Sequence, residues 1–350
     1  MEFELGQLAD LIGGELTEPS QAGVKVSGVR SLDAAGPGDL AFLWDDQYLA
    51  AARTSKASAV IAREAPGGLT CIVVDDPQAA MLMLLGQVYE MRHPDLPPGV
   101  HATAFVSDEA TLGEGVAVGP GAVIEAGATI GERTQVRGGA YVGHNVTIGA
   151  DCQVHPNATI LDHCRLGDRV TVWSGAVIGK DGFGFLQREG KNVRVPQVGN
   201  VIIEDDVEVG ALSTVARGAI ENTIIRKGVI IDDHCHVAHN CEIGEHTIIC
   251  GRTAMGGSVK VGKNVYLLQD AGISTGRTIG DGAVVGRCAR VLEKDLAPGE
   301  QIALAAANYP PVTAMKIQLT LPELPNMRLR LKKLEKRVDE LSKAEEQGRP

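Results

Sequence analysis

His239 and Gly257 have the residue types and the spacing that acyl transfer requires. His239 falls two residues after an aliphatic position and is expected at an outward-facing turn, where an imidazole can act as a general base. Gly257 follows eighteen residues later, leaves room for a substrate, and offers a backbone N–H to a developing oxyanion. Asp232 and Asp233 are expected at the corner just before His239 in the same coil, and a carboxylate near an imidazole can orient it and raise its basicity. These four residues together predict an acyl-transfer site.

Two other interpretations of the histidine remain open. His239 can be a solvated turn residue without a chemical role. His234 and His239 can alternatively hold a metal, since they are five residues apart. A catalytic zinc site needs three protein ligands, however, and no histidine occurs between His163 and His234. The sequence therefore favours a general base, with no metal site expected.

The middle of the chain carries a repeat of six residues. An aliphatic residue recurs at every sixth position over long stretches, which neither helical periodicity nor strand alternation produces. The recurring residues are Val106, Leu112, Val118, Ile124, Ile130, Val136, Val142, Ile148, Val154, Ile160, Leu166, Val172 and Ile178, then Ile203, Val209 and Val215, then Ile225, Ile231, Val237, Ile243, Ile249, Met255, Val261, Leu267, Ile273, Ile279, Val285 and Val291.

A small or β-branched residue occupies most positions four after each aliphatic one, and four cysteines fall there (Cys152, Cys164, Cys235 and Cys241). One large and one small inward residue per hexad describe a short strand followed by a turn. Three hexads then form one triangular coil of eighteen residues, and coils stack at the ~4.8 Å spacing of neighbouring strands. We predict a mainly β fold, a parallel β-helix over residues 100–298, in which the cysteines act as compact hydrophobic residues.

The repeat is interrupted twice. Nineteen residues are inserted at about 180–198, and four more between Val215 and Ile225, where we expect a loop at 216–219. Insertions in repeat proteins become loops on one face, which is often the binding face.

The two ends of the chain lack this repeat. Residues 1–99 predict a small α/β domain with strands at 24–26, 58–62 and 71–74 and a helix at 78–89, opened by Asp76 as N-cap and Pro77. Residues 299–350 predict a C-terminal helical extension. Apolar residues there follow spacings of four and three, as in a short coiled coil that packs on a partner subunit: Met327, Leu331, Leu334, Val338 and Leu341.

The composition excludes several functions. A formal charge of −11 and an aromatic content of 3% disfavour nucleic-acid binding, which needs positive charge and stacking rings. No apolar run approaches the ~18 residues of a membrane span, and the N-terminus lacks the features of a signal peptide. Seven cysteines without a CxxC motif fit a reducing compartment. We therefore expect a cytoplasmic protein without an integral membrane segment.

Several motifs resemble the UDP-3-O-acylglucosamine N-acyltransferase family of lipid A biosynthesis, a hexapeptide-repeat family. In the second half these are residues 181–185 (DGFGF), 195–197 (VPQ), 217–219 (RGA), 222–223 (NT), 231–232 (ID) and 238–240 (AHN). Residues 31–33 (SLD), 36–40 (GPGDL), 42–43 (FL) and 56–61 (KASAVI) are similar to the uridine-binding domain of that family. The resemblance implies a left-handed β-helix and a homotrimer with active sites between adjacent prisms.

This resemblance implies that a 3-hydroxyacyl group passes from acyl carrier protein to the 2-amine of a UDP-glucosamine already acylated at O3. His239 matches the general base and Gly257 the candidate oxyanion donor. Phe42 and Tyr48 match an aromatic pair that holds uracil, whereas Phe183 and Phe185 are expected to line the lipid groove or to pin their loop to the helix surface. No cofactor is expected beyond the 4'-phosphopantetheine that the donor carries.

The chain departs from the pattern of this family in three places. Asp45 replaces an asparagine of the uracil loop, and Asp233 replaces a residue that is often Asn. Gly276 stands where many relatives carry a second histidine, and Arg277 follows it on a normally small inward position, which we expect to bulge outward.

Charge and alternative functions complete these expectations. An acidic carrier protein would need a basic surface, for which later coils supply Arg252, Lys260, Lys263, Arg277, Arg287, Arg290 and Lys294. The alternatives are a sugar-nucleotide O-acyltransferase and a non-catalytic β-helical binding protein.

Overall fold

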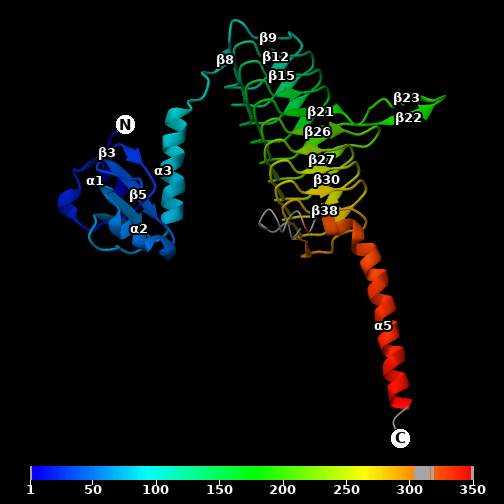
Figure 1. Cartoon of the computed structure of the whole chain (residues 1–350). Coiled ribbons are helices and arrows are strands. Elements are labelled where there is room, and N and C mark those ends of the chain that lie inside the picture. The colour runs from blue at the N-terminus through cyan, green and yellow to red at the C-terminus, as the bar shows by residue number, and fades with distance from the viewer. Residues whose placement is uncertain (1, 303–315, 317–318, 348–350) are drawn as a thin grey trace. The chain divides into compact units, whose positions relative to one another are not determined.

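The computed structural model describes residues 2–302, 316 and 319–347 (Figure 1). The chain divides into two compact units, Met1–Pro97 and Pro98–Pro350. The second unit is the left-handed parallel β-helix that the repeat and the family resemblance predict, which confirms the expected fold class.

The β-helix consists of three parallel sheets, each formed by every third strand along the chain. The first sheet contains β8 (Gly99–Val100), β11 (Ala117–Val118), β14 (Gln135–Val136), β17 (Gln153–Val154), β20 (Thr171–Val172), β25 (Glu208–Val209), β28 (Ile230–Ile231), β31 (Ile248–Ile249), β34 (Tyr266–Leu267), β37 (Val284–Val285) and β39 (Gln301–Ile302). The second contains β9 (Phe105–Val106), β12 (Val123–Ile124), β15 (Tyr141–Val142), β18 (Thr159–Ile160), β21 (Val177–Asp181), β26 (Thr214–Arg217), β29 (His236–Val237), β32 (Ala254–Met255), β35 (Gly272–Ile273) and β38 (Arg290–Val291). The third contains β10 (Thr111–Leu112), β13 (Thr129–Ile130), β16 (Thr147–Ile148), β19 (Arg165–Leu166), β24 (Val201–Ile203), β27 (Thr223–Ile225), β30 (Glu242–Ile243), β33 (Lys260–Val261) and β36 (Thr278–Ile279).

Stacking of the aliphatic positions forms the core. Strands pair in a register of eighteen residues, as in Val123 opposite Tyr141, so each recurring aliphatic side chain lies on the one from the next coil. The four inward cysteines are buried, and burial raises the pKa of the Cys164 thiol to about 11, so this thiol stays neutral. These cysteines are hydrophobic packing residues, as predicted.

The two insertions leave the β-helix at the same edge. We call the turns from the second to the third sheet corner 2–3, and those from the first to the second sheet corner 1–2. The long insertion lies between β21 and β24 and forms a hairpin of β22 (Phe185–Arg188) and β23 (Lys191–Arg194), which projects from the helix in Figure 1. The short insertion lies between β26 and β27. Both therefore belong to corner 2–3.

The first unit is a small α/β fold. Its five-stranded sheet has the order β2 (Glu15–Leu16), β7 (Cys71–Val73), β6 (Ala59–Ala62), β5 (Asp39–Leu43), β4 (Gly28–Val29), with β2 antiparallel to its neighbour. A separate antiparallel pair joins β1 (Phe3–Glu4) to β3 (Lys25–Val26). The helices are α1 (Leu5–Leu11), α2 (Leu49–Thr54) and α3 (Pro77–Arg92).

Sequence predictions for this unit are confirmed in part. The expected helix is α3, and the Asp76 side chain accepts hydrogen bonds from the N–H groups of Gln78 and Ala79. The three expected strands are β3, β6 and β7, whereas α1, β5 and α2 were missed because they are short and their apolar residues follow no clear period.

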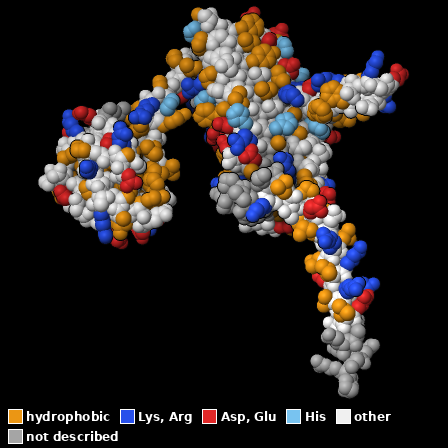
Figure 2. Space-filling view, in the orientation of Figure 1, with side chains coloured by type: hydrophobic (Ala, Val, Ile, Leu, Met, Phe, Trp, Pro, Cys, Tyr) orange, Lys and Arg blue, Asp and Glu red, His pale blue; other side chains and the backbone are white. Residues whose placement is uncertain are grey.

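Helix α5 (Leu324–Gln347) is the C-terminal helix that the sequence predicts. Its five heptad residues, Met327, Leu331, Leu334, Val338 and Leu341, are 50–61% exposed in the single chain. Figure 2 shows hydrophobic and basic side chains close together along this helix. No helix within the described ranges is long and apolar enough to cross a bilayer.

Candidate active site at corner 2–3

His239 lies on corner 2–3, in the turn between β29 and β30, with its imidazole against Gly257 of the next coil. A Cβ built on Gly257 would lie 2.3 Å from His239 Cε1 and 2.5 Å from Nε2, so only glycine fits beneath the ring. The predicted juxtaposition of His239 and Gly257 is present in the structure, on adjacent coils.

The Gly257 N–H is available as a hydrogen-bond donor. At some equivalent turns an aspartate of the next coil caps this group: Asp162 Oδ1 accepts from the His144 N–H and Asp281 Oδ1 from the Lys263 N–H, both at 2.9 Å. The residue eighteen after Gly257 is Thr275, and within the described residues the Gly257 N–H donates no hydrogen bond. Because buried backbone N–H groups are nearly always paired, this one is suited to binding a substrate oxygen.

Asn240, which the sequence analysis did not single out, is the hydrogen-bond partner of His239. Its Oδ1 lies 2.9 Å from His239 Nδ1, and its Nδ2 donates to the Glu221 carbonyl at 3.1 Å. Its backbone is left-handed, with φ of 60°, a conformation that asparagine adopts readily. The motif of residues 238–240 contained this asparagine, but only the structure shows what it contacts.

The long insertion also contacts His239. Gly182 packs on His239 so closely that a Cβ there would lie 2.7 Å from His239 Cβ. Arg217 Nε donates to the Gly179 carbonyl at 2.5 Å and Nη2 to the Asp162 carbonyl at 2.6 Å, which fixes the point where the insertion leaves the helix. The insertion is therefore part of the site.

A second histidine, His236, lies near His239. Burial lowers the pKa of His236, and the nearby Lys180 and His239 lower it further. His236 is therefore neutral at physiological pH and adds no positive charge next to His239.

Asp232 and Asp233 lie on corner 1–2, in the turn after β28, and in this chain neither is bonded to His239. Asp232 accepts hydrogen bonds from the N–H groups of Asp233 and Gly251, both at 2.8 Å. Asp233 accepts from the Ala211 N–H at 2.6 Å. The carboxylates thus cap turns of adjacent coils, and Asn240 occupies the position next to the imidazole that the sequence analysis expected a carboxylate to fill.

Phe183 and Phe185 meet edge to face at the base of the projecting hairpin, with ring centroids 5.1 Å apart. Phe183 is 81% exposed, so it does not pin the loop to the helix surface. Arg194 lies over the Phe185 ring at 5.0 Å and faces Asp181. The hairpin was not foreseen, although the turn residues Glu189 and Gly190 between two short runs were its signal.

Arg277 and Gly276 lie on corner 2–3, one coil beyond Gly257. The Arg277 side chain is 29% exposed, lies 3.4 Å from Asp295, and donates to the Glu293 carbonyl. The guanidinium thus turns outward and is paired. The strands on either side, β35 and β36, keep regular pairing, so the expected bulge is not formed.

The basic surface expected on the later coils is largely neutralised. Four of its seven members form ion pairs: Arg252 with Asp270, Lys263 with Glu245, Arg277 with Asp295, and Lys294 with Glu300.

The expected uracil residues, Phe42, Asp45 and Tyr48, all lie in the first unit. Phe42 is 6% exposed in the core, whereas Tyr48 is 43% exposed, and no ring contact joins them within the described residues. The ring near Tyr48 is Trp44, with centroids 6.1 Å apart. Asp45 accepts hydrogen bonds from the backbone and the side-chain amide of Gln47 and begins the following helical turn.

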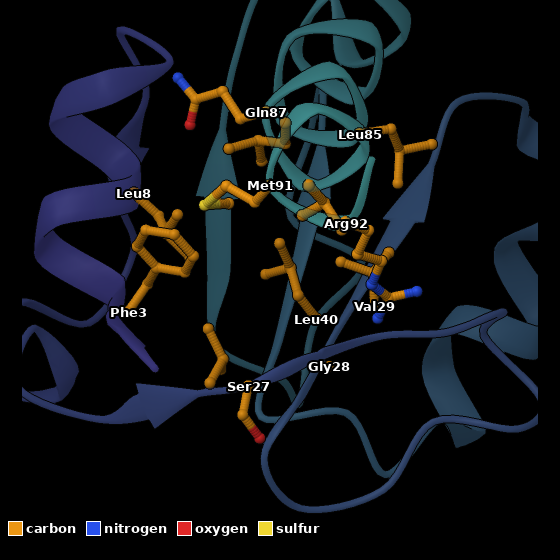
Figure 3. Close-up of a pocket in the computed structure, with 13 residues that line it drawn as sticks. Phe3, Leu8, Ser27, Gly28, Val29, Leu40, Leu85, Gln87, Met91 and Arg92 are labelled. Carbon is orange, nitrogen blue, oxygen red and sulfur yellow. The ribbon is translucent and has the colours of Figure 1, made fainter. Parts of the chain in front are cut away.

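A mainly apolar pocket lies elsewhere in this unit, between α3 and the strands (Figure 3). Met91 of α3 points toward Phe3 and Leu8, whereas Leu85 lies on the side of Val29. None of the expected uracil residues lines this pocket.

No cluster of three or more His, Cys, Asp or Glu side chains in the described part of the chain could hold a metal.

Comparisons with known proteins were made for the sequence and for the fold. Residues 24–86 match the model of the UDP-3-O-(3-hydroxymyristoyl) glucosamine N-acyltransferase family, LpxD, and residues 109–144 and 145–180 match the bacterial transferase hexapeptide model. The solved Arabidopsis UDP-N-acetylglucosamine acyltransferase is 22% identical with a TM-score of 0.53, covering 59% of this chain and 71% of that one. This similarity supports the β-helical fold.

Three relatives carry the name UDP-3-O-acylglucosamine N-acyltransferase. The protein of Coxiella burnetii is 40% identical over 74% of this chain and 75% of its own. The protein of Cupriavidus metallidurans is 42% identical over 74% and 73%. The protein of Syntrophus aciditrophicus is 36% identical over 99% of this chain and 95% of its own. The chain therefore belongs to the UDP-3-O-acylglucosamine N-acyltransferase family.

Proposed function

We propose that this enzyme transfers a (3R)-3-hydroxyacyl chain from acyl carrier protein to the 2-amine of UDP-3-O-(3-hydroxyacyl)glucosamine in lipid A biosynthesis. The observation that carries the proposal is the juxtaposition of His239 with the Gly257 N–H, which has no partner among the described residues, at the corner where both insertions leave the β-helix. A base next to an oxyanion donor is what attack of an amine on a thioester needs.

The proposed reaction proceeds in two steps. The 2-amine attacks the thioester carbonyl as His239 Nε2 takes a proton from the nitrogen, and the Gly257 N–H stabilises the resulting oxyanion. Collapse of the tetrahedral intermediate forms the amide and breaks the C–S bond, and the imidazolium returns the proton to the departing thiolate. The phosphopantetheine arm belongs to the donor, so the mechanism uses no resident cofactor.

The proposed docking site for the acidic carrier protein is helix α5. Residues 328–337 contain six Lys or Arg residues and one Glu, and this part of the helix is exposed. A positive surface raises the association rate of an acidic partner in a salt-dependent way. We place the reaction in the cytoplasm.

We also propose that three copies assemble, with corner 2–3 of one facing corner 1–2 of the next. The exposed heptad residues of α5 require an apolar partner. A groove on corner 1–2 contains Asp232, Asp233 and Trp173, and a neighbouring copy would bring this groove to His239. The expected readout is a trimer mass in light scattering.

The decisive assay measures acyl transfer from 3-hydroxyacyl carrier protein to UDP-3-O-acylglucosamine by the wild type and by His239→Ala. We expect turnover that falls by about 10²–10⁴-fold in the variant, the usual contribution of a general base. Equal rates would remove His239 as the base. If neither protein turns over, UDP-N-acetylglucosamine as acceptor tests the O-acyltransferase alternative, and bound ligand without turnover would identify a binding protein.

A further inference from the structure

The short insertion reaches the partner of the catalytic base. Asn240 donates its backbone N–H to Thr223 Oγ1 at 2.8 Å and its Nδ2 to the Glu221 carbonyl at 3.1 Å. Glu221 belongs to the short insertion, and Thr223 begins β27 directly after it. Asn240 is therefore held by a segment that lies outside the six-residue repeat.

These contacts determine which way the Asn240 amide faces. Nδ2 must point at the Glu221 carbonyl because a carbonyl oxygen only accepts. Oδ1 then faces His239 Nδ1 at 2.9 Å, and since Oδ1 only accepts, Nδ1 carries the proton. In a neutral imidazole Nε2 is then the unprotonated nitrogen, and it lies beside Gly257.

The short insertion is itself fixed on both sides. The Thr223 hydroxyl, fully buried, donates to the Ala216 carbonyl at 2.7 Å. The end of the long insertion adds two hydrogen bonds of 3.0 Å, from the Val198 N–H to the Ala219 carbonyl and from the Gly199 N–H to the Gly218 carbonyl. The Glu221 carbonyl is thus held in place against the Asn240 amide.

We propose that the short insertion, through its Glu221 carbonyl, positions Asn240 and thereby sets the tautomer of His239. The Glu221 carbonyl orients the Asn240 amide, and the amide keeps the proton on Nδ1, so that Nε2 is free to accept the proton of the substrate. The tautomer follows from the contacts alone, whereas its catalytic consequence rests on the proposed function. Asn240 and Glu221 are positioning residues, since they act through His239.

Gly218→Ala tests the insertion directly. The new Cβ would lie 2.3 Å from Asn240 Nδ2 and 2.3 Å from the Glu221 carbonyl oxygen, so the amide must move. The backbone of Gly218 is not in the left-handed region, so alanine adds no strain of that kind. Ile220→Ala is the matched control, since Ile220 lies in the same insertion and is 77% exposed.

Asn240→Asp changes the charge of the residue beside His239 while keeping the size of its side chain. A carboxylate beside the imidazole stabilises the imidazolium form of His239 relative to the neutral form. His236 interacts electrostatically with His239 and with Lys180, and neither His236 nor Lys180 is changed in this variant.

Two readouts are needed. The first is kcat and KM against pH for the transfer reaction. The second is the rate at which diethyl pyrocarbonate labels the His239 peptide as a function of pH, which follows the neutral imidazole without any substrate.

We expect Gly218→Ala to lower kcat by about 10–100-fold with KM within about threefold, because a 1 Å displacement of a catalytic group costs about that much. Ile220→Ala should stay within twofold, on the order of experimental scatter. In Asn240→Asp both the acid limb of the rate profile and the labelling curve should move to higher pH.

Wild-type kcat in Gly218→Ala, or an unmoved labelling curve in Asn240→Asp, would overturn the proposal. A third outcome separates the two proposals. If the labelling curve of His239 moves in Asn240→Asp but the wild type transfers no acyl group, the positioning role stands and the proposed function is rejected.

Discussion

Gly257→Ala should inactivate the enzyme while leaving its fold intact. A methyl group at this position would lie 2.3 Å from His239 Cε1, 2.5 Å from Nε2 and 2.9 Å from Nδ1. Ordinary carbon contacts lie at about 3.5–4.0 Å, so the imidazole must move by roughly 1 Å. The backbone of Gly257 is not in the left-handed region, so alanine introduces no strain of that kind.

The expected magnitude follows from this displacement. Misplacing a catalytic group by 1 Å costs about 10²-fold in rate. Loss of access to the Gly257 N–H would remove oxyanion stabilisation, which is worth about 10²–10³-fold in kcat. We therefore expect kcat to fall by about 10²-fold at least, with thermal stability close to wild type.

The assay measures steady-state acyl transfer from 3-hydroxyacyl carrier protein, with a thermal melt of the same preparation. Gly86→Ala is the control, because Gly86 lies in α3 with open space around it and ordinary backbone angles. A Gly257→Ala enzyme with kcat within threefold of wild type would refute the geometric reasoning, since the ring and the methyl group cannot occupy the same space.

Three further predictions follow from other parts of the molecule. Burial, and secondarily Arg137, lowers the pKa of His155 to about 4, so the unfolded chain binds more protons than the folded one between about pH 6.5 and 4. The free energy of unfolding should therefore fall as pH falls through that window. His155→Gln should reduce this loss between pH 7 and 5 by about 1–2 kcal/mol, measured by urea denaturation, a value lowered because the ring is partly exposed. Arg217→Ala removes two hydrogen bonds to the Gly179 and Asp162 carbonyls and should lower the free energy of unfolding by about 2 kcal/mol, measured by urea denaturation. Tyr48→Ala should raise KM for the UDP-sugar by about 10-fold without changing the melting temperature, because one ring–base stack contributes about 1–3 kcal/mol; an unchanged KM would remove Tyr48 from the nucleotide site.

The repeat could be predicted because each hexad carries its own structural information. One large and one small inward residue define a side of the coil locally, and stacking repeats that pattern eighteen residues later without long-range adjustment. The same register puts Gly257 one coil from His239, since the two residues are eighteen positions apart. The four inward cysteines follow from the same periodicity.

The first unit was predicted less completely. The Asp76 cap and Pro77 define the start of α3 by local chemistry. Strand β5 has alternate residues in two core clusters, with Leu40 and Phe42 on one face and Leu43 on the other. A strand buried on both faces shows no alternation of polar and apolar residues, so only the packing reveals it.

The sequence by itself determined the β-helix, the family, and the placement of His239 next to Gly257, because these depend on residue identity and period. Only the tertiary structure decided what holds His239. Asp232 and His239 are seven positions apart, which spans a whole side of the prism, so the carboxylate caps a different corner within this chain. Asn240 became the partner because two insertions, outside the repeat, fold back onto one corner and present the Glu221 carbonyl to it. Contacts between segments that break a repeat are set by three-dimensional packing, and no periodicity in the sequence encodes them.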